Sequence, residues 1–219
     1  MGNEIDLLAK YPKAKRDLTQ RLESKTEEVR SVARKFDKEF FDGERKFGYG
    51  GFSYDPKYWS EVVKDFSNYY NLNDESKILD VGCAKGFMLY DFYKLNPQLD
   101  LHGVDVSKYA IDNSISEIKN KLQVANATKL PYEDNFFDLV IAINTIHNLD
   151  KEECATALKE ISRVSKKNAF LTVDAYRNNE EKQRMYAWNL TAKTIMSVDE
   201  WIKFFEQNNY DGDYFWFIP

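Results

Sequence analysis

Cysteine and histidine are scarce in this chain, which has two residues of each among 219. Cys83 and Cys154 are far apart in the sequence and lack the short spacing of zinc ligands, so we expect neither a disulfide-stabilised scaffold nor a bound metal. No run of about 18 apolar residues occurs, and the N-terminus is charged throughout. These absences predict a cytoplasmic protein without a membrane span.

Positive charge is not in excess either. The formal net charge is -5, which disfavours a protein that binds the phosphate backbone of a nucleic acid. Hydrophobic residues make up 43% of the chain and aromatic residues 15%, which is enough to fill a sizeable core. We therefore expect a folded domain that has no nucleic-acid partner.

The composition divides the chain into a helical extension over residues 1–46, a segment rich in glycine and aromatic residues over 47–59, and an α/β domain over 60–219. In the first part, apolar side chains recur at three-, four- or seven-residue intervals between charged ones, which predicts amphipathic helix. Such a helix packs on the main domain or forms the contact of a homodimer. The apolar positions are Leu18, Leu22, Val29, Val32, Phe36 and Phe40.

Residues 47–55 read FGYGGFSYD, in which three glycines are interleaved with aromatic residues. This composition excludes a regular helix. Glycine allows motion, and tyrosine offers apolar surface with a hydroxyl group. We therefore expect residues 47–59 to act as a lid that orders over a ligand, with Tyr49 or Tyr54 touching it. The alternative is an ordinary aromatic linker that packs on the core.

Strand-like and helix-like segments alternate from residue 60 onward. Continuous apolar strands separated by helices are typical of a doubly wound, Rossmann-like α/β fold, in which helices cover both faces of a mostly parallel sheet. The expected strands are residues 77–81, 101–106, 122–126, 137–144, 168–175 and 214–218, and the expected helices are 87–95, 109–122, 151–165 and 197–209.

The turn after the first expected strand reads ILDVGCAKGF over residues 78–87. In doubly wound sheets, ligands bind beyond the carboxyl ends of the strands, and this turn is a common site. The pattern is D-x-G-x-A-x-G, formed by Asp80, Gly82, Ala84 and Gly86. The phosphate-loop pattern needs lysine where Phe87 stands, and the dinucleotide pattern needs glycine there, so neither fits. A tight turn without a ligand is the alternative.

Polar positions follow the next two expected strands. Asp105 comes nineteen residues after Gly86, where a carboxylate can accept hydrogen bonds from both hydroxyls of a ribose. Asn126 and Ala127 follow the third expected strand, where an amide side chain and a backbone N–H can meet the edge of an adenine. A helix cap is the alternative role for Asp105.

The order of these segments resembles the successive motifs of class I S-adenosylmethionine-dependent methyltransferases, most closely the small-molecule, ubiquinone-biosynthesis-like (type 11) branch. The resemblance covers roughly residues 75–175, in ILDVGCAKG, LHGVDVS, VANATKLPYEDNFFDLVIAINTIHNL and KNAFLTVD. It implies a seven-stranded sheet and S-adenosyl-L-methionine as cofactor. Ala84 and Asn126 replace a commoner glycine and aspartate, and the chain after residue 209 offers one strand where the family has a late hairpin.

The resemblance also implies which residues bind the cofactor. It places the glycine-rich turn at the methionine end, Asp105 at the ribose, and Asn126 with Ala127 at the adenine. Together with the two lid tyrosines, the expected contacts are Tyr49, Tyr54, Asp80, Gly82, Cys83, Gly86, Asp105, Val106, Asn126, Ala127 and Asn144.

Methyl transfer from a sulfonium depends on alignment, and it needs a base only where the acceptor loses a proton. His147 follows the fourth expected strand and Asp174 ends the fifth, so both are catalytic candidates on the acceptor side. The alternatives are a role in shaping the pocket for His147 and a cap or surface role for Asp174. Further along, Tyr176, Arg177 and Trp188 are candidates for acceptor contacts.

The sequence does not distinguish N-, O- and C-methylation, but it narrows the class of acceptor. The Asn/Asp-Pro-Pro-aromatic signature of many adenine and glutamine methyltransferases is absent after the fourth strand, where the chain reads AINTIHNL. With the negative net charge, this favours a small-molecule acceptor, such as a sugar or natural-product intermediate. Two alternatives stay open: a nicotinamide-dependent oxidoreductase or sugar-modifying enzyme on a similar sheet, and a non-catalytic methyltransferase-like partner subunit.

Overall fold

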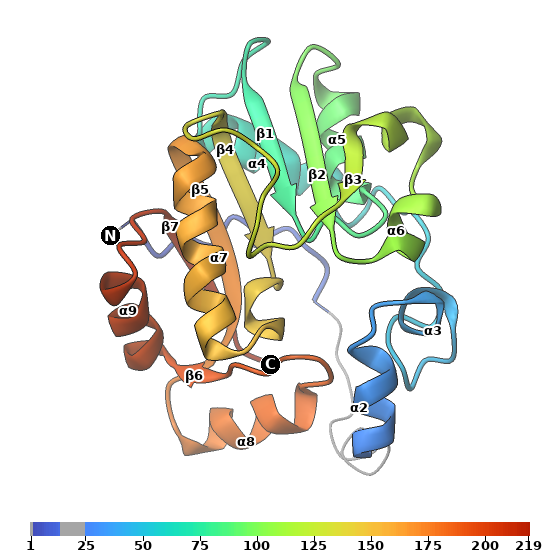
Figure 1. The fold of residues 1–219 in the computed structure, drawn as a ribbon, viewed down its shortest axis with the longest axis vertical. Coiled ribbons are helices and arrows are strands. Elements are labelled where there is room, and N and C mark those ends of the chain that lie inside the picture. Colours follow the sequence, from blue (N-terminus) through green and yellow to red (C-terminus); the bar gives the residue numbers. More distant parts are fainter. Residues whose placement is uncertain (1, 14–24) are drawn as a thin grey trace.

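The computed structural model describes residues 2–13 and 25–219, and a single sheet forms its centre (Figure 1). Within these residues the sheet has seven strands and only parallel pairs, in the order β3-β2-β1-β4-β5, with β6 and β7 both paired to the far edge of β5. This confirms the predicted Rossmann-like, doubly wound α/β fold. The strands are β1 (Lys77–Val81), β2 (Asp100–Asp105), β3 (Leu122–Val124), β4 (Phe137–Ile143), β5 (Ser165–Tyr176), β6 (Met196–Ser197) and β7 (Asp213–Phe217).

Helices cover both faces of the sheet (Figure 1). On one face α4 and α5 pack with Ile78 and Leu139, and on the other α7 and α9 pack with Leu79 and Val140. Because successive side chains of a strand point to opposite faces, β1 and β4 are buried on both sides. The helices are α2 (Glu27–Ala33), α3 (Lys38–Asp42), α4 (Ser60–Tyr69), α5 (Phe87–Leu95), α6 (Lys108–Asp112), α7 (Lys151–Val164), α8 (Asn179–Trp188) and α9 (Val198–Gln207), with 3-10 turns η1 (Ser116–Lys121) and η2 (Ile146–Asn148). None of these helices, in the part of the chain that the structure describes, has the length and apolar character needed to cross a membrane.

The expectation of a continuous helix over residues 109–122 is wrong. The structure has the short helix α6, which ends at Asp112, and then the separate turn η1. Asn113 Nδ2 donates to the carbonyl of Tyr109 at 2.8 Å, and Ser114 Oγ donates to the carbonyl of Ile111 at 2.7 Å. These local polar side chains compete for the carbonyls that a longer helix would use.

The C-terminal part of the chain contains two strands where the sequence predicts one. β7 is the expected final strand, and it pairs with residues 170–174 of β5. β6 was not predicted, because two residues are too few to show an alternating pattern. It pairs with Ala175 and Tyr176, so it extends the same edge at the carboxyl end of β5, where ligands bind in such sheets.

The first residues of the chain are part of the sheet, so the expectation of a helical extension throughout 1–46 is wrong. Ile5 N donates to the carbonyl of Tyr214 on β7 at 2.9 Å, and Tyr214 N donates to the carbonyl of Asn3 at 3.0 Å. Leu7 then packs into the core on the α4 and α5 face with 5% exposure. Among the predicted apolar positions of this part, Leu18 and Leu22 lie outside the described residues.

Helices α2, α3, α6 and α8 gather beyond the carboxyl ends of the strands (Figure 1). Side chains of α2 and its C-cap bind carbonyls at the end of α8 and just after it: Arg30 Nη1 donates to Asn189 O at 3.0 Å, and Arg34 Nε donates to Thr191 O at 3.4 Å. Positive side chains interact favourably with the unpaired carbonyls at the end of a helix. The structure thus packs α2 on its own domain, which was the first of the two predicted alternatives.

The packing of residue 7 is testable by mutation. Leu7→Ala should lower the free energy of unfolding by about 2–5 kcal/mol, because the truncation leaves a cavity in the core. Leu95→Ala, at a side chain with 41% exposure, is the matched control and should cost less than about 1 kcal/mol. Urea denaturation followed by circular dichroism measures both values. Equal, small losses would show that the N-terminal segment does not pack as described.

Candidate functional site

The turn after β1, residues 82–86, is here called the glycine loop. Its backbone is left-handed at Gly82 (φ 85°), Ala84 (φ 50°) and Gly86 (φ 80°). A side-chain carbon at Gly82 would lie 2.2 Å from Thr145 Oγ1, so the close approach of the strand ends requires glycine there. Gly82 and Cys83 both donate their N–H groups to the carbonyl of Val104, at 2.7 and 3.0 Å, which draws the loop toward β2.

Asp105, at the end of β2, holds the glycine loop at Ala84. One carboxylate oxygen accepts the N–H of Ala84 and the other accepts the N–H of Ser107, each at 2.8 Å. Burial raises the pKa of Asp105, and these two backbone donors oppose the rise. Each carboxylate oxygen can accept more than one hydrogen bond, so the side chain that shapes the loop can also accept from a ligand.

Asp80, on β1, is the second buried acid of the site. The residue is only 6% exposed, and its carboxylate has no hydrogen-bond or ion-pair partner among residues 2–13 and 25–219. Burial and the charge of Asp105 raise the pKa of Asp80 to about 7. An unpartnered buried carboxylate beside a second carboxylate fits a ligand that brings positive charge and hydroxyl groups.

The residues expected at the adenine flank this acid pair. The carbonyl of Asp105 accepts the N–H of Ala125 at 3.0 Å, which holds the segment before Asn126 against the end of β2. Val106 is 57% exposed and offers apolar surface there. Asn126 Oδ1 accepts the N–H of Thr128 at 3.0 Å, so within the described residues its side-chain oxygen already serves its own turn.

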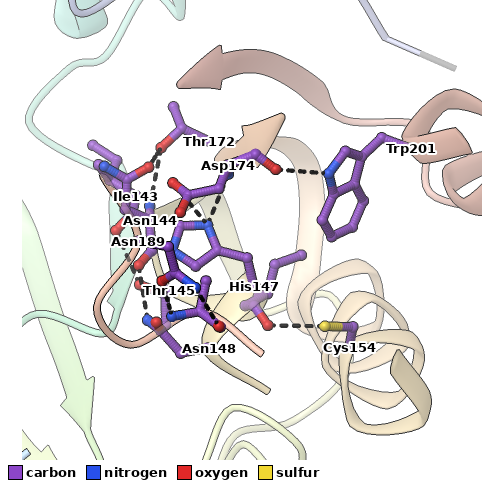
Figure 2. A network of polar contacts seen from close by, with 12 residues as sticks. Ile143, Asn144, Thr145, His147, Asn148, Cys154, Thr172, Asp174, Asn189 and Trp201 are labelled. Atoms are coloured by element: carbon purple, nitrogen blue, oxygen red, sulfur yellow. Dashed lines mark hydrogen bonds and ion pairs between the residues drawn. The ribbon is translucent and has the colours of Figure 1, made fainter. Parts of the chain in front are cut away.

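Asn144 follows β4 and connects the glycine loop to β5. Its backbone is left-handed (φ 52°), its N–H donates to Thr172 Oγ1 at 2.9 Å, and its Oδ1 accepts from the same hydroxyl at 2.9 Å (Figure 2). These bonds position Thr145, which packs against Gly82. Thr145 and Thr172 could not be identified from the residue pattern; the one signal in the sequence is a threonine inside the apolar run AFLTVDA.

The structure brings together His147 from η2 and Asp174 from β5. His147 Nδ1 accepts the backbone N–H of Asp174 at 2.9 Å, and Asp174 Oδ1 lies 3.6 Å from the same nitrogen (Figure 2). Burial lowers the pKa of His147, and the charge of Asp174 opposes this effect. Burial raises the pKa of Asp174, and His147 and Lys25 oppose the rise. Both groups are buried at the carboxyl end of the sheet.

The three residues expected to contact the acceptor have different surroundings. Arg177 is exposed, and its guanidinium lies 3.8 Å from Glu4 and 4.0 Å from Glu181. The ring of Tyr176 lies 5.2 Å from the ammonium of Lys182. The ring of Trp188 packs on that of Phe217, with centroids 5.3 Å apart, and its carbonyl accepts from Lys25.

The predicted lid segment packs beside the glycine loop. Phe52 stacks on Phe87, the residue after the loop, with ring centroids 4.6 Å apart, and Tyr49 contacts Phe52 at 4.2 Å. Tyr54 donates its hydroxyl to Asp91 on α5 at 2.5 Å, which directs it to that helix rather than to the strand ends.

Lys85, which is not among the residues expected at the site, connects the glycine loop to the N-terminal part. Its ammonium donates to Asp42 Oδ2 on α3 at 2.6 Å and to the carbonyl of Phe52 at 2.8 Å. Tyr109 on α6 donates to the same Asp42 oxygen at 2.7 Å. The only sign of this contact in the sequence is a lysine inside a glycine-rich turn. Its partners Asp42 and Phe52 are too far away in the sequence to be predicted from it.

The model of a methyltransferase domain matches residues 72–209 of this chain. A tRNA (carboxymethyluridine(34)-5-O)-methyltransferase of Arabidopsis thaliana is 31% identical over 136 residues, which is 60% of this chain and 31% of that protein. Phosphoethanolamine N-methyltransferase 3 of the same plant is 36% identical over 98 residues, 42% of this chain and 20% of that protein. The chain therefore spans about a third or less of the length of these curated relatives.

Solved structures share the fold. The YcgJ protein of Bacillus subtilis aligns with a TM-score of 0.55 and 20% identity, covering 67% of this chain and 66% of its own. A SAM-dependent methyltransferase of Methanosarcina mazei aligns with a TM-score of 0.53 and 18% identity, covering 65% and 82%. The resemblance to class I S-adenosylmethionine-dependent methyltransferases is confirmed. The chain belongs to the methyltransferase-domain family, with the sheet of the class I enzymes that use S-adenosylmethionine.

Proposed function

We propose that this chain transfers a methyl group from S-adenosylmethionine to a small molecule. The observation that carries the proposal is the unpartnered Asp80 carboxylate beside Asp105, at a glycine loop in which Gly82 packs too closely against Thr145 for a side chain. When bound, the cofactor supplies a methyl group on a positively charged sulfur. Buried carboxylates stabilise positive charge nearby, which fits the donor set of this site.

In the proposed binding mode, the residues of each strand end serve one part of the cofactor. Asp80, with Gly82, Cys83 and Gly86 of the glycine loop, holds the methionine end. Asp105 accepts from the ribose hydroxyls with its remaining lone pairs, and the exposed Val106 covers one side of the adenine. Asn126, Ala127 and Asn144 are proposed as further cofactor contacts.

On the acceptor side, the proposal assigns the pair His147 and Asp174 to the reacting group. Their place at the ends of β4 and β5 is beside the glycine loop, because Thr145 contacts Gly82. Alignment of bound reactants in such a site can supply about 7–11 kcal/mol of the rate acceleration. Tyr176, Arg177 and Trp188 are proposed to contact the remainder of the acceptor.

A small-molecule acceptor is favoured over a nucleic acid by the charge of the chain. The relatives differ in what their names say they methylate, since one is a tRNA methyltransferase and the other a phosphoethanolamine methyltransferase. A net charge of -5 offers little attraction for the phosphate backbone of tRNA. Calorimetry tests the proposal at its base: titration with S-adenosylhomocysteine should give saturable binding, and NAD should give none.

Asp105 should contribute to cofactor binding, both by accepting from the ligand and by holding the glycine loop through Ala84. Asp105→Asn should weaken binding of S-adenosylhomocysteine by about 10–100-fold, because a charge-assisted hydrogen bond contributes about 1.5–3 kcal/mol. Calorimetry measures the affinity, and circular dichroism checks that the variant is folded at the same temperature. Asp112→Asn, at an exposed carboxylate that pairs with Lys108, is the control and should bind normally.

The raised pKa of Asp80 predicts a pH-dependent effect on stability. Between the ordinary pKa of 3.8 and the folded pKa of about 7, the folded state keeps a proton on Asp80 that the unfolded chain has released. The free energy of unfolding therefore falls as pH rises through that window. Asp80→Asn cannot ionise, so its melting temperature should exceed that of the wild type by several degrees more at pH 8 than at pH 5. A constant difference at both pH values would contradict the raised pKa.

The proposed lid should respond to the cofactor. S-adenosylhomocysteine should slow chymotryptic cleavage at Tyr49, which is 44% exposed, because the ligand orders residues 47–59. Asp42→Asn removes the negative charge that pairs with Lys85 and should speed cleavage of the free protein. Asp55→Asn, whose carboxylate pairs with Lys57, is the matched control. Cleavage at one rate with and without the ligand would argue for a fixed linker.

A further inference from the structure

The carboxylate of Asp174 is buried without a hydrogen-bond donor. The backbone of this residue is fully used: its N–H donates to His147 Nδ1, and its carbonyl accepts from Trp201 Nε1 at 2.9 Å (Figure 2). The residue is 6% exposed, yet neither carboxylate oxygen accepts a hydrogen bond from any residue within 2–13 and 25–219. A buried carboxylate is costly unless a donor reaches it, so this group points to a ligand that carries one.

The neighbouring imidazole has a defined proton position. The lone pair of His147 Nδ1 already accepts the N–H of Asp174, so the neutral ring carries its hydrogen on Nε2. Among the described residues Nε2 has no partner. Burial lowers the pKa of His147, which keeps the ring neutral. Toward a ligand, His147 therefore presents an N–H donor and not a basic nitrogen.

We propose that Asp174 is the proton acceptor of the reaction, that His147 donates its Nε2–H to the acceptor atom, and that this atom is a hydroxyl oxygen. The inference rests on the proposed methyltransferase function and specifies its acceptor. Figure 2 shows the carboxylate and the imidazole together on the side of Asn144 and Asn189, with Trp201 on the opposite side. Asp174 Oδ1 lies 3.6 Å from Nδ1 of His147, so the carboxylate adjoins the same ring that carries the Nε2–H donor.

The number of lone pairs selects oxygen over nitrogen. A hydroxyl oxygen has two lone pairs, so it can accept from Nε2–H with one and attack the methyl carbon with the other while its own hydrogen points to Asp174. A neutral amine has a single lone pair, which an Nε2–H donor would occupy. In the step itself, the oxygen–carbon bond forms as the carbon–sulfur bond breaks, the bonding electron pair stays on sulfur, and the hydroxyl proton moves to the Asp174 carboxylate.

The position of the proton on His147 can be measured without turnover. The chain has two histidines, so nitrogen NMR of protein labelled at histidine gives two rings, and His102→Gln assigns them. We expect His147 to show an unprotonated Nδ1 and a protonated Nε2, with no titration near the ordinary pKa of about 6.5. A hydrogen on Nδ1, or titration near that pH, would overturn the donor role.

Substitutions separate a donor from a base. The amide nitrogen of glutamine can replace Nε2 as a donor but cannot accept a proton, so His147→Gln should lose less than about tenfold in turnover, whereas His147→Ala should lose about 10²–10³-fold. Asp174→Asn keeps the backbone N–H to His147 but removes the proton acceptor, and it should lose about 10²–10⁴-fold with the NMR state of His147 unchanged. Equal losses in both His147 variants would show that the imidazole acts as a base.

Matched acceptors test the atom that is methylated. One panel holds phenols and alcohols, the other holds anilines and alkylamines with the same carbon skeletons, and formation of S-adenosylhomocysteine is the readout. Turnover confined to the hydroxyl panel supports the inference, and turnover with the amines or with neither panel overturns it. Calorimetry distinguishes a failure of the proposed function from a failure of this inference. If the protein binds S-adenosylhomocysteine but does not methylate the hydroxyl panel, the methyltransferase function stands and only the hydroxyl acceptor is ruled out.

Discussion

The contact on which the site depends is the clamp between Asp105 and the glycine loop. Two backbone N–H groups, from Ala84 and Ser107, bind the two oxygens of one carboxylate. This clamp holds the loop against β2 in a left-handed backbone that an alanine rarely adopts, and a charge-assisted hydrogen bond is strong enough to offset that strain. The loop in turn packs against Thr145 at Gly82 and leads into the start of α5.

A second backbone contact decides the chemistry of the acceptor side. The N–H of Asp174 takes the lone pair of His147 Nδ1, and the residue type alone gives no sign of this. Histidine beside aspartate suggests a base oriented by an acid. Here the aspartate orients the ring with its backbone, and its carboxylate stays available at 3.6 Å from Nδ1. The roles proposed for the two side chains are therefore the reverse of those that their residue types suggest.

The N-terminal part of the chain closes the domain at two places. Residues 3–5 pair with the edge strand β7, which would otherwise present unpaired N–H and carbonyl groups. Farther along, Asp42 and Phe52 receive the ammonium of Lys85 from inside the glycine loop. The N-terminal part thus covers the sheet edge and is tied to the glycine loop.

The sequence by itself determined the fold class, the glycine loop and the acids at the ends of β1 and β2, because apolar runs, glycines and strand-end carboxylates are local signals. It did not determine the partners of those groups. The break after Asp112, the two-residue β6, the tether at Lys85 and the tautomer of His147 each depend on contacts between segments that are distant in the chain or too short to show a period. Only the tertiary structure brings a backbone N–H to Nδ1, and that hydrogen bond decides whether an imidazole can give or take a proton.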